Sequence, residues 1–183
     1  MQRIVNPTVQ GMASDGARFS GFLYVGLMID AKGNPYVIEY NVRLGDPETQ
    51  PLMMRLDSDL IDLFNATIDG VLDKTTANWS DDTALGIVMA AGNYPAGGSR
   101  GEVIQGLEAA DATGVKVFHA GTSLDDDGKV VTAGGRVLCV TSRANTIEKA
   151  KTQAEEAAKK ISWPNVHWRT DIGYRAVDRA NSS

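Results

Sequence analysis

The sequence predicts a protein of the α+β class, in which a β-hairpin precedes a small β-rich unit that ends in one strong helix. Three observations lead to this prediction. An apolar run, a turn and a second strand-like run follow one another over residues 22–41. Several short strand-like segments lie between residues 84 and 141. An apolar stripe with helical spacing then runs from residue 147 to residue 161.

Composition places the chain among soluble globular proteins. It has 183 residues, of which 43% are hydrophobic and 22% charged, and a net charge of −5. Basic residues never cluster beyond two neighbours, so a nucleic-acid partner is not expected. No apolar run approaches the ~18 residues of a membrane span, and the first residues lack a signal-peptide core. A single cysteine, Cys139, fits a reducing compartment. We therefore expect a cytoplasmic protein without a membrane partner.

The first half of the chain predicts the hairpin and one helix. Residues 1–15 show no clear period and are expected to form a loop. The continuous apolar run at 19–29 predicts a strand covered on both faces, which needs more sheet around it than the neighbouring chain offers. Turn residues and a second strand at 36–41 follow. Residues 43–51 are expected to be a loop stiffened by two prolines. A helix then begins near Asp57 or Ser58 and ends at Gly70.

A polar stretch from Asp73 to Asp82 suggests a boundary between two domains, residues 1–78 and 79–183. Asn145 with Glu148 resembles a capping box for the last helix, which Pro164 stops, and its lysines are expected to form a solvated face. The segments predicted as strands in the second domain are 84–91, 115–119, 129–132 and 136–141, separated by turn-rich segments at 92–101 and 125–128.

Glu39 and Asn41 form the strongest local constellation for chemistry. Residues i and i+2 of a strand point the same way, about 7 Å apart. A carboxylate and an amide oxygen at that spacing suit Mg²⁺, which prefers hard oxygen ligands. The alternative is a solvated polar face of an edge strand, and the pattern by itself favours that reading.

The following loop adds Arg43, Asp46 and Glu48 beside a glycine and two prolines. Arg43 could bind a carboxylate or phosphate, and Asp46 or Glu48 could bind an ammonium group. Equally, Arg43 could neutralise its acidic neighbours.

Other reactive residue types have simpler structural explanations. His119 and His167 show no metal-ligand spacing, and Cys139 lies between core residues. The glycine-rich segment 97–101 lacks a phosphate-loop spacing and is expected to be a turn. Arg136 follows a double glycine and could either reach a substrate phosphate or form a structural ion pair.

Longer strings of the sequence closely resemble the phosphoribosylamine–glycine ligase (glycinamide ribonucleotide synthetase) family of the ATP-grasp superfamily. The matching strings occur in family order over nearly the whole chain. They are residues 21–28, 37–51, 88–95, 117–122, 134–140 and 171–176.

The resemblance implies a fold, a reaction and a set of site residues. The fold would be the C-terminal half of an ATP-grasp core followed by a small domain like a rudimentary single hybrid motif. The reaction would join glycine to 5-phosphoribosylamine, with ATP as co-substrate, through a glycyl phosphate. Glu39 and Asn41 would bind Mg²⁺ or Mn²⁺ at the ATP phosphates. Arg43, Asp46 and Glu48 would lie near the transferred phosphate and the substrates.

The chain also departs from the family pattern, because the preATP-grasp domain and the ATP-clamping lobe are missing. We therefore expect the isolated chain to bind nucleotide weakly and not to turn over. The alternative is a non-catalytic fragment that complements or binds a separate N-terminal lobe. The sequence leaves open whether Met1 is a natural start.

Overall fold

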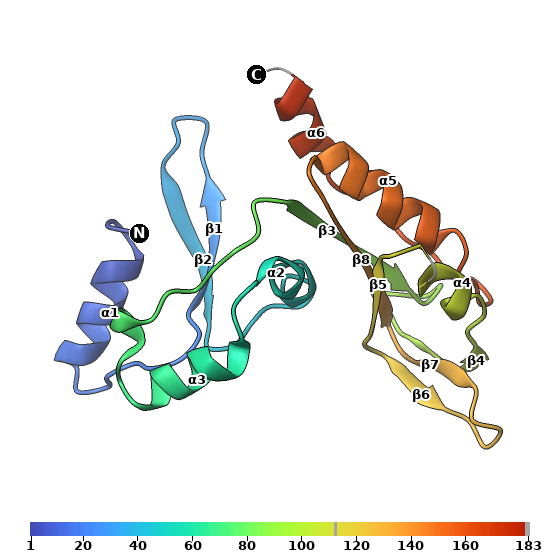
Figure 1. Cartoon of the computed structure of the whole chain (residues 1–183), viewed down its shortest axis with the longest axis horizontal. Helices are drawn as coiled ribbons and strands as arrows, with labels where there is room; N and C mark the ends of the chain where they lie inside the picture. Colours follow the sequence, from blue (N-terminus) through green and yellow to red (C-terminus); the bar gives the residue numbers. More distant parts are fainter. Residues whose placement is uncertain (112, 182–183) are drawn as a thin grey trace. The chain divides into compact units, whose positions relative to one another are not determined.

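A computed structural model describes residues 1–111 and 113–181 (Figure 1). The chain forms two compact units, which are described separately. The first contains Met1–Asp46 and Asp59–Thr76, and the second contains Pro47–Ser58 and Ala77–Ser183. Helices and small antiparallel sheets occur in both units, which confirms the α+β prediction. The chain cannot be divided into these units at a single position, because Pro47–Ser58 belongs to the second unit and Asp59–Thr76, which follows it, belongs to the first. The domain limits 1–78 and 79–183 stay a prediction.

The first unit is built on the predicted hairpin. Its strands pair antiparallel, and a register shift lies between Gly26 and Leu27. A turn that begins at Asp30 joins the two strands. The Asp30 carboxylate stabilises this turn by accepting hydrogen bonds from the backbone N–H groups of Lys32 and Asn34, both at 2.8 Å. The elements of this unit are α1 (Val5–Ser14), β1 (Tyr24–Ile29), β2 (Pro35–Asn41), α3 (Leu60–Ile68) and a 3₁₀ turn at Leu72–Lys74 (Figure 1).

Three expectations for the first unit are wrong. Residues 5–14 form a helix rather than a loop. The helix was not predicted because it buries no residue and therefore needs no apolar stripe in its sequence. The apolar strand is not covered on both faces within this unit, since Met28 and Ile29 are 60% and 55% exposed. Helix α3 is capped by Asp59 rather than by Asp57 or Ser58, because the Asp59 carboxylate accepts a hydrogen bond from the Ile61 amide at 2.8 Å.

The second unit contains two three-stranded antiparallel sheets. Their strand orders are β3-β8-β5 and β4-β7-β6. The four predicted strands are confirmed as β3, β5, β7 and β8, whereas β4 and β6 were missed because both are short and largely exposed. The bounds are β3 (Thr83–Ala90), β4 (Ser99–Val103), β5 (Lys116–His119), β6 (Thr122–Leu124), β7 (Val130–Gly134) and β8 (Arg136–Ala144).

Helix α5 (Ile147–Ala158) packs against β3 and β8 and closes the core of the second unit (Figure 1). The predicted alanine stripe is confirmed: Ala150 and Ala154 are fully buried with Leu85 and Ile87 of β3. Small residues at these positions let the helix approach the sheet closely. The other helices of this unit are α2 (Thr49–Arg55), α4 (Leu107–Asp111) and α6 (Tyr174–Asn181).

Two local predictions about α5 are corrected. The cap is Thr146 rather than Asn145, because the Thr146 hydroxyl accepts the Lys149 amide at 3.2 Å. Lys151 is not part of a solvated face, since its side chain is only 22% exposed and its ammonium donates to the carbonyl oxygens of Thr170 and Ile172.

Within the described ranges, no helix combines the length and the apolar character that a membrane crossing demands.

Candidate functional site

The candidate metal ligands Glu39 and Asn41 lie on one face of β2. In the hairpin register Glu39 is opposite Gly26 and Asn41 is opposite Tyr24, both before the irregularity in β1. Tyr40, between them, belongs to the other face, where its hydroxyl is 2.9 Å from the Thr8 hydroxyl of α1. The two-residue period therefore places both oxygen donors on the face opposite α1.

Gly26 provides the space in which the Glu39 side chain lies. A Cβ atom built on Gly26 would be 3.0 Å from Glu39 Cγ, closer than side chains normally approach. A side chain at position 26 would therefore require the Glu39 side chain to shift by a few tenths of an ångström. Glu39 is exposed and Asn41 is half-buried, so both can be reached from solvent.

These two donors fit a metal that takes most of its ligands from a substrate. Among residues 1–111 and 113–181, no group of three or more His, Cys, Asp or Glu side chains could hold a metal ion. Mg²⁺ is commonly bound by one or two protein oxygens together with waters and substrate phosphates. One carboxylate and one amide match that pattern, whereas a metal site made of protein ligands alone would need more donors.

The loop residues divide between the two units. Arg43 and Asp46 are exposed members of the first unit, and the Arg43 guanidinium donates to the Leu44 carbonyl at 3.1 Å. Glu48 belongs to the second unit, where it is the residue before α2. The predicted loop is thus shorter than expected, since residues 49–55 are helical. Pro51 is tolerated because it occupies the first turn, where no intrahelical donor is needed.

The second unit contains a cavity of about 260 Å³ that the sequence did not reveal. Trp168 lines it, and the indole N–H of Trp168 is buried without a hydrogen-bond partner in the described part of the chain. Arg169, also at the cavity, forms two hydrogen bonds to Asp171 at 2.8 and 2.6 Å, and these lower the pKa of the Asp171 carboxyl. The other lining residues include Pro47, Val88, Tyr94 and His167.

Gln50, like Trp168, has a buried polar atom that the sequence did not indicate. Its side-chain oxygen is buried without a hydrogen-bond partner among the described residues, two positions after Glu48. In the sequence Gln50 is only a polar residue beside a charged loop. Most surface helices contain such residues, so the pattern does not indicate a buried side chain. The cavity residues come from four separate chain segments, so no local pattern joins them.

The remaining candidates have structural surroundings. Cys139 is buried, with Sγ 3.5 Å from the Thr141 hydroxyl, as expected for a small core residue. His119 is exposed and its Nδ1 lies 3.1 Å from the Thr122 hydroxyl. A Cβ on Gly98 would collide with the Gly134 backbone, so that glycine serves a close contact between chain segments. Arg136 begins β8 and is half-buried.

Comparison with known proteins gives the same family for both parts of the chain. Residues 84–175 match the family described as phosphoribosylglycinamide synthetase, C domain. Residues 1–49 match phosphoribosylglycinamide synthetase, ATP-grasp (A) domain.

Curated relatives named phosphoribosylamine–glycine ligase align over almost all of the chain. Identity is 54% over 179 residues with the Vibrio parahaemolyticus protein and 56% over 182 residues with that of Xylella fastidiosa (strain Temecula1). It is 52% over 179 residues with the Escherichia coli K12 protein. These alignments include 98–100% of this chain but only 42% of each relative, so the chain spans less than half of their length.

A solved structure agrees with these matches. The crystal structure of phosphoribosylamine–glycine ligase from Thermotoga maritima superposes with a TM-score of 0.72 and 35% identity, over 89% of this chain and 39% of that one. Together, the two family matches, the relatives and the shared fold show that the chain belongs to the phosphoribosylglycinamide synthetase family, with part of an ATP-grasp domain followed by the C domain.

Proposed function

We propose that the chain supplies the metal-binding strand and part of the substrate site of a phosphoribosylamine–glycine ligase acting in the cytoplasm. One observation supports this most directly. Glu39 and Asn41 lie on one open face of β2, within the segment that matches the ATP-grasp domain. The family is a ligase family that makes a purine precursor, and an ATP-grasp ligase needs such an oxygen-donor pair at its nucleotide phosphates.

The proposed reaction has two steps. A glycine carboxylate oxygen attacks the γ-phosphorus of ATP, the bond to the β-phosphate oxygen breaks, and ADP leaves. The nitrogen of 5-phosphoribosylamine then attacks the carbonyl carbon of glycyl phosphate, phosphate leaves, and the nitrogen loses a proton. The products are glycinamide ribonucleotide, ADP and phosphate.

The protein contributes charge and alignment rather than covalent chemistry. Glu39 and Asn41 would hold Mg²⁺ or Mn²⁺, which neutralises the phosphate charge when bound. Arg43 is exposed beside these ligands in the chain, and its guanidinium can bind a phosphate or carboxylate with two hydrogen bonds. Asp46 or Glu48 would bind the glycine ammonium group. In this scheme the loop orients the substrates while the strand holds the metal.

We also propose that the isolated chain binds nucleotide weakly and does not turn over. The chain corresponds to 42% of its relatives, and ATP in this superfamily lies between two lobes. Joining the chain to the remaining N-terminal part of the Escherichia coli relative, or mixing the two, would then restore activity.

The test measures ADP release from ATP, Mg²⁺, glycine and 5-phosphoribosylamine. The chain is assayed alone and with the added N-terminal part. We expect turnover only in the mixture, dependent on both substrates, lost in Glu39→Gln and retained in Glu108→Gln. Glu108 is a matched control because it is an exposed glutamate on α4 of the second unit. An active mixture that tolerates Glu39→Gln would contradict the proposed metal site.

A second candidate is a non-catalytic module that binds a separate N-terminal lobe. The exposed apolar side chains of the hairpin favour it: Ile38 and Val42 are 63% and 71% exposed, and Met28 and Ile29 are 60% and 55% exposed. Unpaired apolar strand edges commonly mark an interaction surface. Here the mixture would form a stable complex by analytical ultracentrifugation but release no ADP.

A further inference from the structure

We infer that Arg143 is a positioning residue, which holds α2 on the second unit and thereby fixes the backbone of Glu48. Arg143 lies near the end of β8, far in sequence from the loop. The consequence for catalysis rests on the proposed role of Glu48, whereas the positioning itself does not.

Helix α2 needs such support because it is short. It has seven residues, and isolated helices below about 12 residues are marginal in water. Its order matters for Glu48, since the Leu52 amide donates to the Glu48 carbonyl at 3.2 Å. If α2 loosens, that hydrogen bond is lost and the Glu48 backbone is no longer held.

The C-terminal carbonyls of α2 find their partners in the second unit. The carbonyl of Met54 accepts a hydrogen bond from Arg143 Nη1 at 3.0 Å, and the carbonyl of Arg55 accepts the Ser80 amide at 2.8 Å. The Arg55 guanidinium donates back to the Ser80 carbonyl at 2.8 Å. These bonds satisfy helix-end groups that otherwise have only water as a partner.

Arg143 also connects α2 to two carboxylates. Its Nη1 lies 3.2 Å from Asp57 Oδ1, just after α2, and its Nε lies 3.7 Å from Asp82 Oδ2, just before β3. These side chains are between 37% and 50% exposed, so the ion pairs contribute little as charges alone. The planar guanidinium contacts three groups from two chain segments at once, which a lysine ammonium cannot reproduce at the same positions.

The first turn of α2 packs directly on the same sheet. A Cβ on Gly86 of β3 would lie 3.3 Å from Pro51 Cγ, so the absence of a side chain at Gly86 allows the close approach. Both ends of α2 are thus attached to the second unit, and Pro47–Ser58 groups with it. Glu48 is therefore held by the second unit, whereas Glu39 and Asn41 are held by the hairpin of the first.

The first arm of the test is amide hydrogen exchange on the chain itself. We expect Arg143→Met to speed exchange at the Leu52 and Leu56 amides by about fivefold, and Arg143→Lys by less. Exchange in the core strand β3 should not change. Arg100→Met is the matched control, because Arg100 is an exposed arginine on a strand of the same unit. Unchanged exchange at Leu52 and Leu56 in Arg143→Met would overturn the inference.

The second arm uses the active mixture with the N-terminal part. We expect Arg143→Met to lower kcat by about fivefold and to leave Mn²⁺ affinity unchanged, with partial recovery in Arg143→Lys. Faster exchange at Leu52 with an unchanged kcat would overturn the link to Glu48. A wild-type mixture without turnover would instead count against the proposed function, and the exchange data would still decide the positioning role.

Discussion

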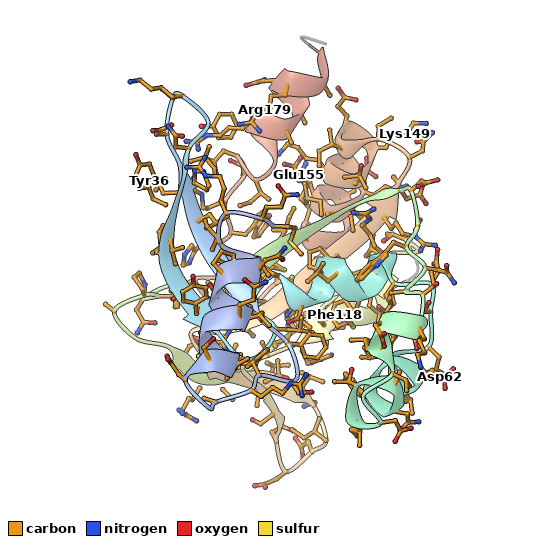
Figure 2. All side chains as sticks on the ribbon, turned by 90° about the vertical axis from the view of Figure 1, so that its left-hand side faces the viewer. Tyr36, Asp62, Phe118, Lys149, Glu155 and Arg179 are labelled. Carbon is orange, nitrogen blue, oxygen red and sulfur yellow. The ribbon has the colours of Figure 1, made fainter. Side chains whose placement is uncertain are left out.

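Lys151→Met removes a partly buried ammonium that connects helix α5 to the segment just before α6. Lys151 Nζ donates to the Thr170 and Ile172 carbonyl oxygens at 2.8 and 3.1 Å and pairs with Glu155 one turn along α5. Lys149 and Glu155 both project from this helix (Figure 2). Methionine keeps the apolar stem of the side chain and removes only the charge and the donors.

The expected loss follows from the number and burial of these bonds. A hydrogen bond to a charged group contributes about 1.5–3 kcal/mol, and three are lost. The loss is reduced because Glu155 is 24% exposed and can bind water, and because the lysine no longer pays a desolvation cost. We expect the free energy of unfolding of the second unit to fall by about 2–3 kcal/mol.

Urea unfolding followed by tryptophan fluorescence measures this unit selectively, because Trp79, Trp163 and Trp168 all lie in it. With a slope of about 2 kcal/mol per M, the midpoint should fall by about 1 M. Lys149→Met is the control, since Lys149 is exposed on the same helix, and it should change the midpoint little. Equal midpoints for the two variants would refute the reasoning.

Two further predictions concern backbone conformation and pH. Gly106→Ala should destabilise the second unit by about 3 kcal/mol or more in the same urea assay, because φ is +81° and the new Cβ would collide with the Lys160 carbonyl oxygen. Gly114→Ala, at φ +80° in open space, should cost only about 1 kcal/mol; equal losses would show that the close contact is unimportant. Hydrogen bonds from Asn34, chiefly its backbone amide, hold the pKa of Asp30 below its ordinary 3.8. Because the folded pKa is lowered, the contribution to hairpin stability should be present above pH 3.8 and be lost as the pH falls through the lowered pKa. An NMR titration of the folded chain that places the Asp30 midpoint at or above 3.8 would contradict this.

The hairpin and the main core elements could be predicted because their signals are local. Alternating or continuous apolar runs with turn residues between them identified β1, β2 and β3, and the alanine stripe identified α5. The pair Glu39 and Asn41 could be placed on one face for the same reason, since the strand period is two. The irregularity in the hairpin register lies beyond both residues and does not separate them.

The elements that were missed depend on contacts from distant segments. Helix α1 buries no side chain, so its sequence shows no apolar face. Helix α2 contains a proline and follows a turn-rich loop, and its order comes from Arg143, Ser80 and the packing on Gly86. The burial of Lys151 likewise depends on carbonyl groups that lie 19 and 21 residues away.

The sequence by itself determined the family, the α+β class, the hairpin and the position of the two candidate metal ligands on one strand face. Those features follow from short-range periodicity and from strings of residues that need no three-dimensional context. Only the tertiary structure decided that Glu48 belongs with the second unit while Glu39 and Asn41 belong with the first. The physical reason is that a seven-residue helix is ordered by whatever its ends and one face contact, and those partners lie dozens of residues further along the chain.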